Sequence, residues 1–258
     1  MFNMIIILLA TLNSEPVGTN DYRISRFILS NLRSIQTYNI SQLAQACFVS
    51  NSSISRFCRK IGFRDFNELK QQFFQWTDIG EKKFAYEGRL TTALKDTYID
   101  SIIENLLLLK KSVRNEELQQ LAKDILTYPK VAAFGSLHSQ SVVLNLQTDL
   151  LTSGIVMDTR TRFQEQLEYI ENAGEDTLIL LFSRGGSHLK RFLVHDLQLS
   201  RNSKPKLVMI TASENIRSNK YIDQFIYYEE KEGFTAYPYA FEVITGILAL
   251  EVFARKNE

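Results

Sequence analysis

The stretch with the clearest chemical potential is VSNSSISRFCRKIGF, residues 49–63. It begins with short polar side chains and continues with basic residues at helical spacing. Short hydroxyl and amide groups at a helix start can bond base edges or phosphates, and arginine can neutralise phosphate or bind guanine. The residues predicted to contact DNA are Ser50, Asn51, Ser52, Ser53, Ser55, Arg56, Arg59 and Lys60. The competing interpretation is an ordinary solvated helix with a basic side.

The residues around this stretch favour the DNA-binding interpretation. Asn39 followed by Gln42 is typical of a capping box at a helix start, and Ser50 can cap the next helix. The apolar positions that would hold these two helices at a fixed angle are Ile40, Leu43, Ala44, Val49, Ile54 and Phe57. Two short helices joined by a tight turn, the second basic and polar outside, describe a helix-turn-helix.

Composition limits the class of protein. The 258 residues are 45% hydrophobic, which is enough for one or two domains with a large core. The apolar run from Met4 to Ala10 is too short to span a bilayer and follows no basic segment, so a buried first helix is expected. Cys47 and Cys58 form no CxxC pair and lie near no histidine cluster. We therefore expect no disulfide, metal or cofactor, and a reducing compartment, the cytoplasm.

Charge is distributed unevenly along the chain. Residues 1–77 hold eight Lys and Arg against four Asp and Glu, whereas the remainder holds 22 against 25. A basic N-terminal segment on a mildly acidic remainder suggests a polyanion-binding unit. We predict a helix-turn-helix domain over 1–77 (the head), a polar linker over 78–90, and a second domain over 91–258 (the body).

The body begins with helical patterns and then alternates. Amphipathic helices are predicted over about 91–112 and 115–128. Four apolar strands follow, in KVAAFGS, TLILLFSRGG, KLVMITAS and DQFIYYE. Helical stretches are predicted near 138–153, 161–172, 187–201 and 237–255. This alternation predicts a parallel sheet with helices on both faces, so the fold class is α/β overall: an all-α head followed by a flavodoxin-like αβα body.

The head resembles a known family. The stretch ISQLAQACFVSNSSISRFCRKIGFRDFNELKQQ is similar to the N-terminal domain of RpiR-type bacterial transcription regulators, and the resemblance covers 20–76. The matching residues are Leu43, Ala44, Val49, Ser50, Ser53, Ile54, Arg56, Phe57, Arg59, Gly62, Phe63, Phe66, Glu68, Leu69 and Lys70. One departure is Phe48, where many such turns have glycine and where a left-handed backbone would be strained.

The resemblance extends to the body, which is similar to a sugar isomerase (SIS) domain. It implies a repressor of sugar or amino-sugar metabolism that binds a phosphorylated sugar in that domain. In an open parallel sheet, ligands collect at the carboxyl ends of strands, and phosphates favour N–H and hydroxyl groups at helix starts. The first such loop is FGSLHS, 134–139. It follows the family pattern G-x-G-x-S at Gly135 and Ser139 but has Leu137 for the second glycine.

The second loop is SRGGSHLK, 183–190, against the family pattern S-x-S-G-x-T. Ser183 and Gly186 match, whereas Gly185 and His188 replace the second serine and the threonine, so two hydroxyls are missing. The predicted ligand-binding residues are Gly135, Ser136, His138, Ser139, Ser183, Arg184, Gly186, Ser187 and His188. A glycine-rich turn that serves packing alone is the alternative.

Catalysis is not expected, and no catalytic residue is assigned. Isomerisation needs a placed base, and His138, His188 and Glu242 lie in no motif that demands the role. Asp223 resembles the family's acidic residue before the last strand and is expected to be structural. Two alternatives stay open: a SIS-type sugar-phosphate isomerase, and a DNA-binding regulator whose SIS domain only dimerises. The expected partners are double-stranded DNA with a palindromic operator, a phosphorylated sugar effector, and further copies of the chain in a homodimer or dimer of dimers, with no membrane.

Overall fold

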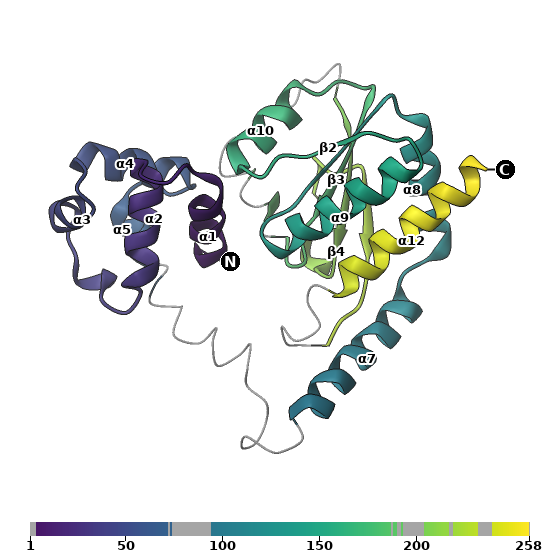
Figure 1. Cartoon of the computed structure of the whole chain (residues 1–258), viewed down its shortest axis with the longest axis horizontal. Coiled ribbons are helices and arrows are strands. Elements are labelled where there is room, and N and C mark those ends of the chain that lie inside the picture. Colours follow the sequence, from purple (N-terminus) through teal and green to yellow (C-terminus); the bar gives the residue numbers. More distant parts are fainter. Residues whose placement is uncertain are drawn as a thin grey trace.

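The computed structural model contains a helical head and an α/β body (Figure 1). It describes residues 4–71, 73, 94–186, 188–189, 192, 204–216, 219–231 and 239–257. The predicted linker, 78–90, and the predicted ligand residue Ser187 lie outside the described residues, as does most of the predicted helix 187–201. The boundaries between head, linker and body therefore stay predictions.

The head is built from short helices. Their bounds are α1 Met4–Ser14, α2 Asn20–Ser30, η1 Ile35–Thr37, α3 Ile40–Ala46, α4 Asn51–Lys60 and α5 Phe66–Gln71. The apolar start forms the buried first helix that was expected, because Leu8 of α1 packs in one core with Ile24, Leu43 and Phe57. The apolar pattern of residues 22–35 predicts a helix over that range, but α2 ends at Ser30. Its C-cap residue is Asn31, whose side-chain amide donates to the Phe27 carbonyl at 2.8 Å.

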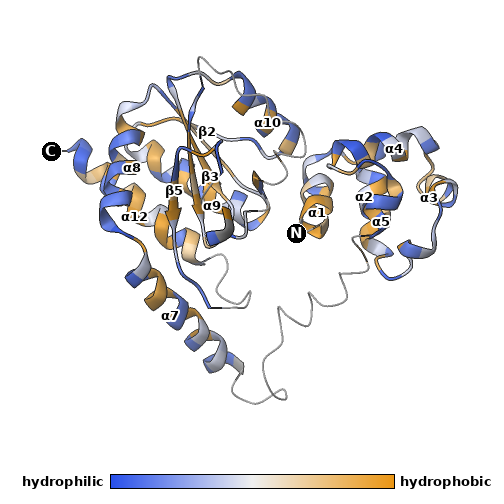
Figure 2. Cartoon of the chain, turned by 180° about the vertical axis from the view of Figure 1, so that it is seen from behind, coloured by the Kyte–Doolittle hydropathy of each residue, from blue (hydrophilic) through white to orange (hydrophobic). Residues whose placement is uncertain are grey.

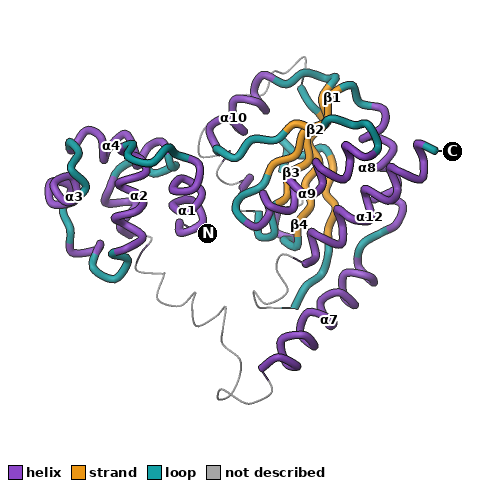
Figure 3. Tube along the Cα trace, in the orientation of Figure 1, coloured by secondary structure: helices purple, strands orange, loops and turns teal. Residues whose placement is uncertain are grey.

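The body consists of a parallel sheet enclosed by helices. Its helices are α7 Leu94–Ser112, α8 Asn115–Thr127, α9 His138–Thr152, α10 Phe163–Asn172, η3 Glu214–Ile216 and α12 Tyr239–Lys256. Its strands are β1 Lys130–Phe134, β2 Met157–Asp158, β3 Thr177–Phe182, β4 Lys206–Thr211 and β5 Gln224–Tyr227. They are all parallel, in the order β2-β1-β3-β4-β5. Figure 3 separates the strands of the body from the surrounding helices.

Alternate side chains of each strand enter two different cores, which explains the three layers. Val131 and Ala133 face the core shared with α8, α9 and α12, whereas Ala132 and Phe134 face the core shared with α10. The strands are predominantly orange in Figure 2, and blue residues lie on the helices around them. This burial on both faces is typical of parallel strands. β2 was not predicted, because two residues are too few to establish a strand pattern.

Helix α7 extends from the body as an arm (Figures 1 and 2). Near its end Leu109 is buried, whereas Ile99, Ile103 and Leu107 are exposed. These three apolar residues recur at helical spacing and therefore form one stripe. Among the described residues, no helix combines the length and the apolar character that crossing a bilayer requires.

Candidate functional sites

Local hydrogen bonds determine where the two central helices of the head begin. The Asn39 side chain accepts from the Gln42 backbone N–H, and the Gln42 side chain accepts from the Asn39 N–H, both at 2.9 Å, which confirms the predicted capping box. Ser50 Oγ accepts from the Ser53 N–H at 3.2 Å and caps α4. Gly62, just after α4, has a φ of 95°, a conformation that glycine adopts without strain.

The turn between α3 and α4 is tight and strained. Phe48 has a φ of 56°, so the left-handed backbone anticipated at this non-glycine position is present. Its side chain is 87% exposed and gains little from packing. The Val49 N–H donates to the Ala44 carbonyl at 2.9 Å, which closes the turn. The surrounding hydrogen bonds therefore hold Phe48 in a conformation that costs about 1–2 kcal/mol for an ordinary residue.

The predicted DNA-binding residues of α4 divide between an outer and an inner side. The side chains of Asn51, Ser52, Arg56 and Arg59 are exposed. Ser53 is buried and receives the Asn20 side-chain amide at 3.4 Å. The exposed members lie outside the helix core and present amide, hydroxyl and guanidinium groups to solvent, whereas Ser53 serves the packing of α2 on α4.

Lys60, at the end of α4, forms ion pairs within the head. Its ammonium lies 2.9 Å from Glu15 Oε1 and 2.6 Å from Asp21 Oδ2. Burial opposes the charge, but hydrogen bonds to the two carboxylates outweigh it and raise the pKa of Lys60 above its usual value. The sequence pattern of α4 contains no sign of these partners, which come from the end of α1 and the start of α2.

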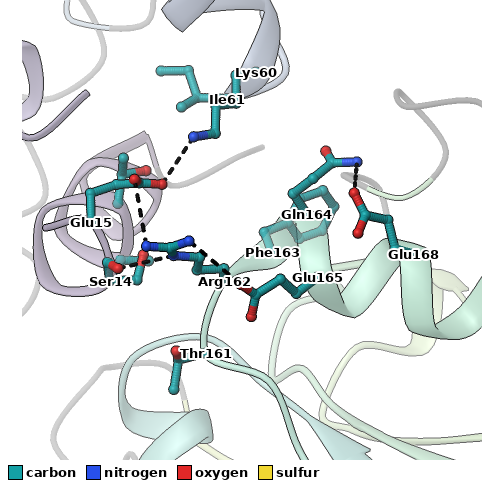
Figure 4. A pocket seen from close by; sticks show the side chains of 12 residues that line it. Ser14, Glu15, Lys60, Ile61, Thr161, Arg162, Phe163, Gln164, Glu165 and Glu168 are labelled. Atoms are coloured by element: carbon teal, nitrogen blue, oxygen red, sulfur yellow. Dashed lines mark hydrogen bonds and ion pairs between the residues drawn. The ribbon is translucent and has the colours of Figure 1, made fainter. Parts of the chain in front are cut away.

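The same carboxylate, Glu15, also faces the body (Figure 4). Arg162, which precedes α10, donates from Nε to the Ser14 carbonyl at 3.0 Å, and its Nη2 lies 3.8 Å from Glu15 Oε2. These residues line a cleft of about 280 Å³ between head and body. Glu15 thus lies between Lys60 of α4 and Arg162 of the body. No sequence signal could have found this contact, because its partners lie about 148 positions apart.

In the body, the first predicted loop joins β1 to α9 and is closely packed. A Cβ on Gly135 would lie 2.7 Å from Ser139, so the glycine is required for the close approach. Two buried glutamines that no sequence pattern indicated hold the loop: the Gly135 N–H donates to Gln140 Oε1 at 3.2 Å, and Gln166 Nε2 donates to the Gly135 carbonyl at 3.0 Å.

Leu137 stands where the family pattern has its second glycine, and it has a φ of 51°. The body therefore contains a second non-glycine residue with a positive φ, here with a ψ of −111°. Its neighbours among the predicted ligand residues differ in exposure. His138 is exposed at the start of α9, whereas Ser139 is buried.

The second predicted loop follows β3. Ser183 Oγ accepts from the His188 N–H at 3.2 Å, so this hydroxyl is hydrogen-bonded to a backbone amide of the same loop. Gly186 has a φ of 71°, and a Cβ there would lie 2.8 Å from Ile216. The Arg184 carbonyl accepts from the Thr211 hydroxyl at 2.9 Å, which ties the loop to the end of β4.

A hydrogen bond brings the two predicted loops together. Ser136 Oγ and His188 Nδ1 are 3.0 Å apart, although 52 positions separate them in the chain. The imidazole is buried, and its ring centroid lies 5.7 Å from that of Phe163 and 4.7 Å from that of Phe192, both in edge-on geometry. Ser136 and His188, from two of the predicted loops, therefore meet at the carboxyl edge of the sheet and bind each other there.

Asp223 has the structural position that was expected. Its Oδ2 accepts from the Leu207 N–H at 2.9 Å, and its Oδ1 lies 2.6 Å from the Lys204 ammonium. It therefore joins the approach to β5 with the start of β4.

These features define a two-domain protein with a helix-turn-helix head and a parallel α/β body. Residues 8–76 match the helix-turn-helix domain of the rpiR family. The head is therefore similar to an rpiR-family helix-turn-helix domain, and the chain joins it to a parallel α/β domain.

The relatives found by comparison include transcriptional regulators. The chain is 30% identical over 128 residues to the HTH-type transcriptional regulator GlvR of Bacillus subtilis, a match that covers 50% of this chain and 46% of GlvR. It is 25% identical over 203 residues to HexR of Pseudomonas aeruginosa, covering 77% of this chain and 70% of HexR. The chain thus spans about half the length of GlvR.

A solved structure shares the fold across both domains. The Vibrio vulnificus NanR protein complexed with ManNAc-6P superposes with a TM-score of 0.55 at 15% identity, covering 98% of this chain and 92% of NanR. At this identity the likeness establishes the fold alone.

Proposed function

We propose that this protein is a transcriptional regulator, a repressor of sugar or amino-sugar metabolism whose head binds an operator and whose body binds a phosphorylated sugar. The observation that carries the proposal is the exposed polar and basic face of α4, with Asn51, Ser52, Arg56 and Arg59, inside an rpiR-family helix-turn-helix domain. In this motif the second helix enters the major groove with its N-terminal residues at base edges. Asn51 and Ser52 are at that end, and the arginines follow along the same helix.

The effector class is supported by the position of the two loops. Both lie at the carboxyl ends of neighbouring parallel strands, β1 and β3, where open α/β sheets collect ligands. The NanR protein, which shares the fold, is complexed with ManNAc-6P. A phosphorylated sugar bound here would act on the head only by binding its two arrangements with different affinity.

The apolar stripe on α7 supports self-association. Ile99, Ile103 and Leu107 are exposed there, and α12 exposes Ile247 and Leu250. Apolar surface on two helices of one body is suited to contact with a second copy. A homodimer or dimer of dimers would then present paired heads to a palindromic operator.

A second candidate is a regulator whose body only dimerises. The Ser136–His188 hydrogen bond favours it, because both side chains were predicted to meet the ligand and instead bind each other. Calorimetric titration with a panel of hexose and amino-sugar phosphates separates the two candidates. Binding of any member supports an effector site, and turnover of a ketose or aldose phosphate would favour an isomerase instead.

The operator is tested by fluorescence anisotropy with DNA from upstream of the protein's own operon, compared with a scrambled duplex at two salt concentrations. The proposal predicts tight binding to the native fragment that weakens steeply with salt. Equal, weak binding to both duplexes would contradict it.

A further inference from the structure

Arg184 lies in the second predicted loop after β3, which is named here the candidate anion loop. Its guanidinium pairs with a carboxylate of the body. Its Nε is 2.6 Å from Glu230 Oε1, and both side chains are largely buried. Its backbone is anchored separately, because the Arg184 carbonyl accepts from the Ala212 N–H at 3.0 Å and from the Thr211 hydroxyl. The guanidinium can therefore change partner without displacement of the loop backbone.

The segment that carries Glu230 is fastened to α7. The Glu229 N–H donates to Ser112 Oγ at 2.9 Å, and the Lys231 N–H donates to Asn105 Oδ1 at 2.8 Å. Asn105 is buried, and the Lys231 ammonium lies 2.6 Å from Glu104. Residues 229–231 thus connect the candidate anion loop with the arm of the body.

We propose that Arg184 is a shared cation for which Glu230 and a phosphate group bound beside residues 183–186 compete, and that the exchange changes how segment 229–231 holds α7. This inference rests on the proposed effector site and names its means of regulation. A phosphate offers more charge and more acceptor oxygens to a guanidinium than one carboxylate does. Release of Glu230 removes the side-chain tie between the loop and the segment bound to α7.

The environment of Glu230 suits such an exchange. Burial raises the pKa of the Glu230 carboxyl, and the nearby Arg184 opposes that rise without cancelling it. The ion pair therefore holds a carboxylate in a place that disfavours its charge. A carboxylate that loses its cation in such a place is costly to leave charged. The raised pKa of Glu230 favours uptake of a proton when Arg184 turns to a second anion, and this limits the cost of the exchange.

The first test compares anion binding by variants of the full-length chain. Inorganic phosphate and a panel of hexose 6-phosphates are titrated calorimetrically into wild type, Glu230→Gln and Arg184→Gln. Loss of the competitor in Glu230→Gln should tighten binding roughly two- to fivefold. Loss of the shared cation in Arg184→Gln should weaken it about tenfold or more. Glu229→Gln, the same change one residue away on an exposed side chain, should leave affinity unchanged.

The opposite signs distinguish competition from a merely structural ion pair, which would make both variants bind more weakly. If wild type binds a probe and Glu230→Gln binds it equally or more weakly, the competition is refuted while the effector site stands. If wild type binds no probe at all, the proposed effector site fails and the inference fails with it. Should Arg184→Gln not fold, Arg184→Lys replaces it, because the lysine keeps the charge but loses the forked donor geometry.

The second test follows segment 229–231 by hydrogen exchange. In Glu230→Gln, and in wild type saturated with the tightest-binding phosphate probe, the amides of Glu229 and Lys231 should exchange faster than in unsaturated wild type, because their bonds to α7 lose support. Glu229→Gln serves again as control. Unchanged exchange in both samples would overturn the proposed link to α7.

Discussion

The predicted site residues of the head and of the body differ in exposure and in how far apart their partners lie in the sequence. In the head, exposed residues of one helix, from Asn51 to Arg59, present polar groups outward, and their backbone is held by local caps. In the body, the predicted residues come from two loops, and Ser136, Ser183 and His188 form hydrogen bonds with each other or with the loop backbone. In the head, Asn51 Nδ2 also donates to Ser41 Oγ at 3.0 Å and Ser52 Oγ lies 2.8 Å from Ser50 Oγ, but these bonds are exposed. The bonds of Ser136, Ser183 and His188 are at least partly buried. The comparison shows that a contiguous surface helix keeps its polar groups in contact with solvent, whereas a site assembled from distant loops can bury them.

The largest expected effect concerns the exposed side chains of α4 in the head. The double variant Arg56→Ala, Arg59→Ala should bind operator DNA at least about tenfold more weakly, because each substitution takes away a guanidinium that can bind a phosphate or a base. The slope of log affinity against log salt should fall by about one for each phosphate that is no longer neutralised. Anisotropy titrations at several salt concentrations measure both quantities.

Arg64→Ala is the matched control for this variant. Arg64 is exposed, lies beyond α4 and pairs with Glu68. Its replacement should have the smaller effect on DNA affinity. An unchanged affinity of the double variant would refute α4 as the reading helix.

The close packing of the first predicted loop in the body is tested at Gly135. Gly135→Ala would place a Cβ 2.7 Å from Ser139, so we expect the free energy of unfolding to fall by about 1–3 kcal/mol. Gly185→Ala meets nothing within 4 Å and should change it by less than about 0.5 kcal/mol. Urea denaturation measures both. Equal stabilities of the two variants would show that the first loop is looser than its packing indicates.

A strained turn in each region allows a finer comparison. Phe48→Gly should raise the free energy of unfolding by about 1 kcal/mol, because glycine relieves the left-handed backbone and the exposed ring contributes little packing. Leu137→Gly relieves another positive φ but also removes a partly buried side chain, so its gain should be smaller. Val17→Gly, at another exposed apolar residue, should not stabilise the protein. Thermal and urea unfolding provide the values.

The smallest effect concerns the place where head and body meet. Glu15→Gln removes one carboxylate from Lys60 and from Arg162, and it should lower the free energy of unfolding by less than about 1 kcal/mol. The pKa of Lys60 is raised in the folded protein, so its stabilising contribution is complete below the ordinary lysine pKa of about 10.4 and is lost as pH rises through the folded value.

The difference between wild type and Glu15→Gln should therefore shrink between neutral and strongly alkaline pH in urea denaturation. Glu165 pairs with Arg162 but not with Lys60. The difference between wild type and Glu165→Gln should therefore show no such shrinkage. A constant difference across this range would mean that Glu15 does not raise the pKa of Lys60.

Much of the fold could be predicted because its signals are local. The capping box at Asn39, the cap at Ser50 and the left-handed residues at Phe48 and Gly62 depend on neighbours within a few positions. The apolar runs of β1, β3, β4 and β5 indicate strands buried on both faces. Strand β2 and the early end of α2 escaped prediction, because the first is too short for a pattern and the apolar pattern of residues 22–35 continues past the end of the second.

The sequence by itself determined which helix presents basic groups and which loops contain glycine, because side-chain type and near neighbours decide both. Only the tertiary structure decided what those groups bind. Lys60 meets Glu15 and Asp21, His188 meets Ser136, and Arg184 meets Glu230. Each of these pairs joins residues at least 39 positions apart. Such partners are chosen by how helices and strands pack, and the packing depends on the whole core.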